Sequence, residues 1–392
     1  MTTHSHRRVG ALDGLRGFGA LVVVARHTLN AIAMPESSRR ALLEGPLALV
    51  LNGNAMVQMF FVLSGYVLAD SAARGRRPAD VAQFYVRRIF RIHPPYVFGV
   101  LVAWMGGYLY AAWPKGEAVT EWLRVFAGIH LSARDLLASL AFPGHAHLQV
   151  PVGWTLTVEM IFSFLLPLLV VTARPVRGLP LLMVAAVAML MAPAVPAVAY
   201  GLDFAFGVVM HQERDALART FDRLPSVVRG ALLPAALLVM AAPLLLGWSV
   251  PAVGLLLMPP DRRALAMMSV GASALVAAVV FLPWPRRVFS SRPLVGIGEF
   301  SYSLYLLHMP VLYLCAPYLV APVGWGSGLA LLAVVTAMSC TLAWAGWRWV
   351  ERPSIVAGDR VCIWLARRVG TRALPSSLAR QRAADGPVNV SG

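Results

Sequence analysis

Two ionisable side chains in the first long apolar stretch are placed where they could act on a ligand inside a membrane. Arg16 and His27 are 11 residues apart. At about 100° per residue, this spacing returns to the same face of a helix about 16 Å further along. An ionisable group inside a membrane span costs about 2.5 to 3.5 kcal/mol, so each one is a functional candidate by default. The pair therefore predicts one polar cavity, which Arg16 and His27 line at two different depths in the membrane.

Two further ionisable residues, Glu159 and His308, lie within later apolar stretches. The helical rise places Glu159 about 12 Å below the outer end of its predicted span, and His308 about 16 Å above the inner end of its own. His27 lies in the outer half of its span, so we expect the three side chains to converge near mid-membrane. A single buried His or Glu is equally well explained as a hydrogen-bonded packing residue, but three at similar depth favour a functional site.

A pair of cations precedes another apolar stretch, in the segment YVRRIFRIHPPY. Arg88 and Arg91 are spaced i and i+3, so they share one face of a helix. Guanidinium groups bind phosphate through two parallel hydrogen bonds, which favours a cytosolic ligand that carries phosphate. Arg16 is expected to add a third cation, oriented by Asp13 three residues before it. The alternative is that these arginines only hold the loop on the cytoplasmic side.

The composition of the chain decides what surrounds these residues. Its 392 residues are 58% hydrophobic and 13% charged, with a mean hydropathy of +0.68. Soluble domains carry about 25% charged residues, so a soluble globular enzyme is excluded. The net charge of +16 is spread over short loops rather than gathered in one patch, which excludes nucleic acid as the partner. The chain is predicted to lie in the lipid bilayer.

Apolar runs of about 20 residues, each long enough to cross the membrane, recur along the chain. Backbone groups in lipid must be satisfied internally, and these runs are too long for barrel strands. The predicted fold is therefore all-α, a polytopic transmembrane helix bundle of about ten spans. We place the spans near 11–33, 50–70, 93–113, 151–172, 179–196, 198–212, 230–248, 267–284, 297–320 and 325–349.

Arginine-rich loops alternate with nearly balanced ones, which orients the bundle. Cytoplasmic loops carry the excess of Lys and Arg, so both termini are predicted to be cytoplasmic in the cell membrane. The loop 71–92 is then inside and the loop 114–150 outside. The arginines assigned to the inside, besides those at the N-terminus, are Arg74, Arg76, Arg77, Arg87, Arg88, Arg91, Arg174, Arg177, Arg286, Arg287 and Arg292.

The chain divides into a transmembrane domain, 1–353, and a basic cytoplasmic tail, 354–392. Apolar residues are interleaved with arginine in 359–382, so this part is expected to lie on an anionic leaflet, and the end to be disordered. The three cysteines have no metal-like spacing, so no metal site and no bound cofactor are predicted. The motifs of P-loop transport ATPases, hydrolase elbows and zinc proteases are absent from the sequence.

The order of six segments resembles the acyltransferase 3 family of integral membrane O-acyltransferases. The resemblance covers 12–353 and rests on LDGLRGFGALVVVARH, MFFVLSGYVLA, YVRRIFRIHPPY, VGWTLTVEMIFSFLLPLL, IGEFSYSLYLLHMPV and WVERP. It implies a ten-helix core that takes acyl groups, often acetyl, from cytoplasmic acyl-CoA. It further implies transfer to a hydroxyl of an extracytoplasmic or lipid-linked glycan or, in some members, of a macrolide antibiotic.

The family pattern can be carried over to particular residues of this chain. Its Arg and His of the first span fall on Arg16 and His27, its R-x-x-R on Arg88 and Arg91, and its later Glu on Glu159. The resembling segments also contain further polar residues, which we assign to acceptor contacts or to structural polar contacts: Asp13, Ser64, Tyr302 and His308. The chain departs from the family at Met160, Ser163 and Met309, where relatives often carry an acidic or amide residue, a Tyr and an aromatic residue.

These residues suggest a mechanism in which acyl-CoA is a co-substrate. Arg88 and Arg91, with Arg16, hold the CoA phosphates at the cytoplasmic mouth. His27 is the general base on the acceptor hydroxyl, and Glu159 orients His27. An acyl-enzyme intermediate stays open. Two other classes stay open as well: a transporter or exporter of a glycolipid or antibiotic, and an inert membrane sensor or assembly partner.

Overall fold

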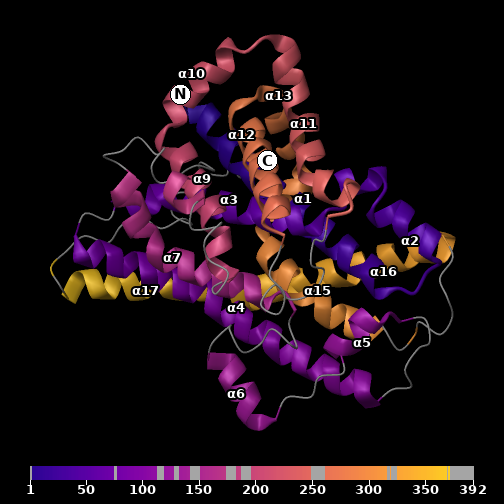
Figure 1. Cartoon of the computed structure of the whole chain (residues 1–392). Helices are drawn as coiled ribbons and strands as arrows, with labels where there is room; N and C mark the ends of the chain where they lie inside the picture. The colour runs from indigo at the N-terminus through magenta and orange to yellow at the C-terminus, as the bar shows by residue number, and fades with distance from the viewer. Residues whose placement is uncertain are drawn as a thin grey trace, which may run out of the picture.

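The structure is a computed structural model of the whole chain (Figure 1). It describes residues 2–74, 77–112, 119–127, 132–141, 151–173, 182–186, 196–248, 261–315, 318, 325–368 and 370. Most of the predicted span 179–196, and the predicted tail beyond 370, lie outside the described residues.

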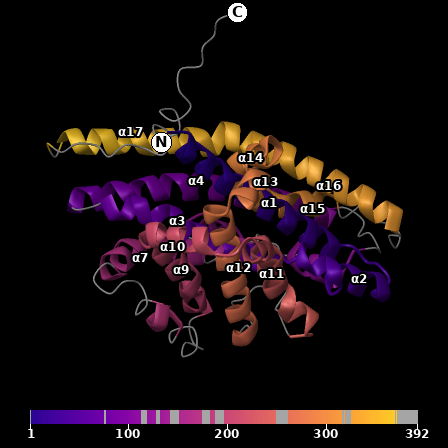
Figure 2. The ribbon, with the colours of Figure 1, turned by 90° about the horizontal axis from the view of Figure 1, so that it is seen from above.

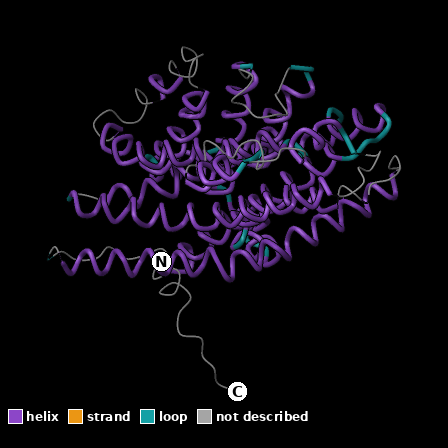
Figure 3. Tube along the Cα trace, turned by 90° about the horizontal axis from the view of Figure 1, so that it is seen from below, coloured by secondary structure: helices purple, strands orange, loops and turns teal. Residues whose placement is uncertain are grey.

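The described chain consists of helices and loops, without a strand (Figure 3). An isolated antiparallel β-bridge joins Ile32 and Val119. The all-α prediction is confirmed. The α-helices are α1 (Thr2–Ala31), α2 (Glu36–Leu43), α3 (Gly53–Arg74), α4 (Pro78–Ala112), α5 (Glu121–Ala127), α6 (Ala133–Ala141), α7 (Gly153–Ala173), α9 (Gly201–Gln212), α10 (Arg214–Arg223), α11 (Ser226–Leu245), α12 (Arg262–Phe281), α13 (Pro283–Phe289), α14 (Arg292–Glu299), α15 (Ser301–Cys315), α16 (Trp325–Gly346) and α17 (Arg352–Arg368). Two 3₁₀ turns, η1 (Pro46–Leu49) and η3 (Pro196–Tyr200), and a π-helical turn, η5 (Trp347–Glu351), connect some of them.

Six segments of the described chain are long and apolar enough to cross a membrane, which makes this a polytopic helical membrane protein. They are Glu36–Ala72, Pro78–Ala112, Gly153–Val170, Ser226–Leu245, Arg262–Phe281 and Gly328–Arg368. The sequence predicts ten spans. The difference has a physical cause, because α1 is long enough but is made more polar by its ionisable residues, while α9 and α15 have only 12 and 15 residues.

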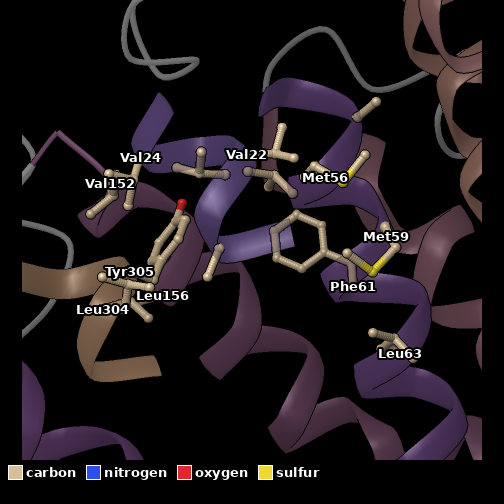
Figure 4. Packing of buried hydrophobic residues seen from close by; sticks show 14 of the residues in the cluster. Val22, Val24, Met56, Met59, Phe61, Leu63, Val152, Leu156, Leu304 and Tyr305 are labelled. Atoms are coloured by element: carbon tan, nitrogen blue, oxygen red, sulfur yellow. The ribbon is translucent and has the colours of Figure 1, made fainter. Parts of the chain in front are cut away.

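The core of the bundle forms where α1, α3, α7 and α15 meet. Figure 4 shows Val22 of α1 beside Met56 and Phe61 of α3, and Val24 of α1 beside Val152 and Tyr305. Phe61 also stacks on Phe204 of α9, with ring centroids 5.3 Å apart. Lipid tails are as apolar as these side chains, so the helices associate through close packing rather than through the hydrophobic effect. This packing fixes the rotation of α1 and therefore the direction of its polar residues.

Glycine brings α1 into backbone contact with α14. A Cβ on Gly17 would lie 2.8 Å from the Gly298 nitrogen and closer still to the Leu294 carbonyl oxygen, and a Cβ on Gly14 would overlap the Phe289 carbonyl. Small residues allow this approach between membrane helices. The contact holds the turn that carries Asp13 and Arg16 against α14.

The C-terminal helices extend along one side of the molecule, next to α4 (Figure 2). α16, η5 and α17 follow one another without an interruption, and the widened turn of η5 comes just before Pro353, whose ring would clash with an ordinary helical carbonyl. α17 is tied to α4 by Arg87, whose Nε lies 3.0 Å from Asp359 Oδ1. The predicted boundary at 353 therefore falls inside a continuous helix, and residues up to Arg368 pack on the bundle.

Candidate active site

Two histidines from distant parts of the chain meet inside the bundle. His27 Nδ1 of α1 lies 2.8 Å from His308 Nε2 of α15, and the rings are stacked with centroids 5.1 Å apart. Trp122 of α5 covers the other side of His27, with ring centroids 5.4 Å apart. His308 is fully buried, whereas His27 is half-buried. The structure thus brings together two of the three residues that were expected to converge near mid-membrane.

The partners of His308 determine which nitrogen of each ring carries the proton. His308 Nδ1 lies 3.2 Å from the carbonyl oxygen of Leu304, which can only accept a hydrogen bond. Nδ1 of His308 is therefore the protonated nitrogen, and Nε2 of a neutral ring accepts. His27 Nδ1 must then donate to His308, which leaves the lone pair of His27 on Nε2.

A partly open cavity borders His27. Its walls include Trp122, Trp154, Tyr305 and Arg26. Tyr305 is held by Thr155, whose Oγ1 lies 3.0 Å from the tyrosine hydroxyl oxygen. A hydroxyl-bearing ligand in this cavity would therefore lie beside His27.

Glu159 lies on α7 and pairs with Arg88 of α4. Arg88 Nη2 donates to Glu159 Oε1 at 2.6 Å and to Ser163 Oγ at 2.8 Å. The expectation that Glu159 orients His27 is corrected by this geometry. A carboxylate in a low-dielectric interior needs a cation, which Arg88 supplies, while the neutral His27 needs only an acceptor, which His308 supplies.

The arginines that were predicted to bind phosphate gather in one cluster. Arg16 Nη1 lies 3.6 Å from Asp13 Oδ1, so Asp13 orients it as expected. Arg91 interacts electrostatically with Asp13, Arg16 and Glu351. Arg16 also interacts electrostatically with Arg88. Within the described residues, Arg91 makes no ion pair shorter than 4 Å. The cluster therefore holds cations that retain capacity for an anionic ligand.

The remaining predicted polar residues, Tyr302 and Ser64, lie in surroundings that suit a structural role. Tyr302 donates through its hydroxyl to the carbonyl oxygen of Ile92 at 2.9 Å, close to the arginine cluster. Ser64 is buried in α3, and in the described part of the chain it forms no hydrogen bond to the histidine pair or to the cluster. Both positions fit structural polar contacts better than direct contacts to a ligand.

Sequence reasoning missed Glu351 and Trp122. Glu351 is buried in η5, and Ser303 Oγ donates to its Oε2 at 2.7 Å. Its presence in the segment WVERP, at the end of an apolar run, was a usable signal, because an ionisable residue there is costly. Trp122 lies in the short helix α5, and nothing in the sequence links it to His27.

The family of the chain follows from a sequence comparison. The model of the acyltransferase 3 family, described as an acyltransferase domain, matches residues 9–348. The chain therefore belongs to this family of membrane acyltransferases. Its helical membrane fold agrees with that class, and no solved structure matches the chain.

Three named proteins are similar to the chain at 26% identity. The first, of Bacillus subtilis (strain 168), is named "Putative peptidoglycan O-acetyltransferase YrhL", and the match covers 91% of this chain and 56% of that protein. The second is "Acyltransferase MdmB" of Streptomyces mycarofaciens, with 78% and 79% covered. The third is "Nodulation protein 10" of Rhizobium leguminosarum bv. viciae, with 90% and 95% covered. The chain thus spans little more than half the length of the Bacillus protein.

Proposed function

We propose that the protein is a membrane O-acyltransferase that moves an acyl group, acetyl in the first instance, from acyl-CoA to a hydroxyl of a glycan, glycolipid or macrolide. Membership of the acyltransferase 3 family supports the acyl transfer. Two relatives whose names specify acetyl or acyl transfer support it further. The observation that carries the proposal is the contact between His27 and His308 at the edge of a cavity.

The donor binds through the arginine cluster. Arg88, Arg91 and Arg16 receive the phosphates of CoA, because planar guanidinium groups match phosphate oxygens and these side chains are half-buried. Arg16 and His27 are 11 residues apart on α1, which is about 16 Å along the helix. The extended pantetheine arm spans this separation and carries the thioester to His27. Glu159 serves as a positioning residue that holds Arg88.

The chemical step uses the free Nε2 of His27. This nitrogen takes the proton of the acceptor hydroxyl, whose oxygen attacks the thioester carbonyl carbon. The C–S bond breaks, and the sulfur of CoA receives the proton from His27, so the base is restored. His308 keeps the His27 ring in the required tautomer and accepts from its Nδ1 as the positive charge develops.

The direction of the reaction across the membrane is part of the proposal. The cation cluster faces the cytoplasm, where acyl-CoA is made available, and both chain termini lie on that side. This orientation is supported by the alternation of arginine-rich and balanced loops. The acceptor enters through the cavity next to His27 from the opposite side.

Release of free CoA from acetyl-CoA by the purified protein tests this function. The protein in lipid nanodiscs is supplied with acetyl-CoA and with glycan, glycolipid or macrolide acceptors, and free thiol and acylated product are measured. An acyltransferase releases CoA in proportion to the acylated acceptor. A transporter or an inert sensor releases none, and that outcome across the acceptor panel contradicts the proposal.

A further inference from the structure

Arg26 is the neighbour of His27 on α1 and lines the same cavity. Its Nη1 donates to the carbonyl oxygen of Leu43 at 3.0 Å. Its aliphatic stem passes over Gly53, where an added Cβ would lie 3.3 Å from the Arg26 Cβ and Cγ. The guanidinium is therefore held in a fixed place beside the proposed base, and the proposed mechanism gives it no task.

The charge of Arg26 is not neutralised inside the cavity. Among the described residues that line the cavity, Arg26 carries the permanent positive charge, and none is an Asp or a Glu. Glu44 acts on Arg26 from a distance, but it lies 3.8 Å from Arg39 Nη2 and has no ion pair with Arg26. The wall of the cavity next to His27 is therefore positive.

A half-buried guanidinium with one neutral partner has unused hydrogen-bonding capacity, because the group carries five N–H donors. If its task were only to anchor Leu43, a neutral donor would serve without the cost of placing a charge there. Arg26 lines the cavity, so the polar wall of the cavity favours a ligand that accepts hydrogen bonds and carries negative charge.

We infer that the acyl acceptor carries an anionic group, a carboxylate or a phosphate, that binds Arg26 while the acceptor hydroxyl meets His27 Nε2. Because the two residues are adjacent on α1, the anion fixes which hydroxyl of the acceptor reaches the base. Arg26 is thus a specificity-determining residue. That the anionic ligand is the acyl acceptor rests on the proposed function, but the anion site itself can be tested without turnover.

The first experiment measures the potential in the cavity. Asn54, which also lines it, is changed to Cys in a chain whose three natural cysteines are replaced by alanine. The thiol is reacted with an anionic sulfonatoethyl and with a cationic trimethylammonioethyl methanethiosulfonate. Arg26→Gln should lower the ratio of the anionic to the cationic rate by about fivefold to tenfold. The matched control is Arg40→Gln, which removes an exposed arginine paired with Glu36 and should leave the ratio unchanged.

The second experiment asks whether an anionic sugar occupies the site. Labelling of the cysteine at position 54 is measured with glucose, glucuronate or glucose 6-phosphate at equal ionic strength. Protection by glucuronate identifies a carboxylate site and protection by glucose 6-phosphate a phosphate site. In either case protection should be lost in Arg26→Gln and kept in Arg40→Gln. Equal protection by glucose, or no protection by either anion, overturns the inference.

The two experiments are repeated in the His27→Ala background, which separates the inference from the proposed function. Binding to Arg26 needs no general base, so protection should persist there. Protection in the unaltered protein without any release of CoA would count against the enzyme and leave the anion site standing. Because Asn54→Cys lies near the start of α3, Asn30→Cys provides a second reporter on the cavity wall, and a thermal melt checks that each variant is folded.

Discussion

The partner of the proposed base is neutral, which sets this site apart from triads in which a carboxylate orients a histidine. His308 accepts from His27 without bringing a negative charge into the apolar interior. A neutral acceptor avoids the cost of a buried carboxylate but stabilises the developing imidazolium less. In the proposed mechanism, His308 therefore contributes more by fixing the tautomer of His27 than by stabilising the positive charge that develops on it.

Replacing His308 should lower the rate according to whether an acceptor atom remains. His308→Leu keeps volume but leaves His27 Nδ1 without a partner, so kcat should fall by about 10². His308→Gln places an amide oxygen near the lost nitrogen and should recover a large part of that loss. Steady-state kinetics at pH 7 measure both variants. Equal kcat values for the Leu and Gln variants would show that His308 only packs against His27.

Conservative changes in the arginine cluster separate ligand binding from a topology signal. Arg88→Lys and Arg91→Lys keep the charge but lose the planar fork, so the KM for acyl-CoA should rise by the equivalent of about 1 to 3 kcal/mol. The value of kcat should change little if the phosphates bind equally in ground and transition states. Arg77→Lys, an exposed arginine just before α4, is the control. An unchanged KM in both cluster variants means that the donor binds elsewhere.

Among the elements, α1 bears both Arg16 of the cluster and His27, the proposed base. Its lower turns are fixed by the glycine contact with α14, and its upper turns by α5 and by the hydrogen bond from Arg26 to Leu43. A shift of α1 along its axis would move the donor site and the base together. The relative position of the two sites is thus built into a single helix.

The glycine contact between α1 and α14 should be sensitive to a single methyl group. Gly17→Ala should destabilise the protein by about 1 to 3 kcal/mol, because the added Cβ meets the Leu294 carbonyl and the Gly298 nitrogen, both backbone atoms. Gly296→Ala is the matched control on α14, since its Cβ meets nothing within 4 Å. Thermal unfolding in detergent measures the two variants. Identical unfolding curves would contradict the packing described for α1.

The all-α class and the apolar runs could be read from the sequence, whereas the number of spans and the rotation of the helices could not. Hydropathy marks apolar runs, and the rise per residue converts sequence position into depth. Depth suggested that Glu159 would meet His27, but α7 directs Glu159 to Arg88 instead. Rotation is set by packing between helices distant in sequence, such as α1 with α15. The continuation of the helix through Pro353 likewise depends on the π-helical turn before it.

On the scale of the whole molecule, α4 is longer than the membrane is thick. Its 35 residues would extend over about 52 Å, against about 30 Å of hydrocarbon. α17 packs along α4. Both helices carry arginine, from which we predict that the N-terminal end of α4 is cytoplasmic.

Cysteine labelling in intact cells tests this orientation. In a chain without the natural cysteines, Arg40→Cys in α2 should react with a membrane-impermeant maleimide added outside, because that residue is exposed. Arg77→Cys should react only after the membrane is permeabilised, since the loop 71–92 is predicted to be cytoplasmic. Reaction at position 77 in sealed cells would refute the topology.

The most direct test of the central claim is turnover and donor binding measured together on His27→Ala. The purified variant in nanodiscs should bind acetyl-CoA with the affinity of the unaltered protein, because the arginine cluster is untouched. Its release of CoA in the presence of an acceptor should fall by about 10² to 10⁴, the contribution of a general base. Near-normal turnover in this variant would contradict the assignment of His27 as the base.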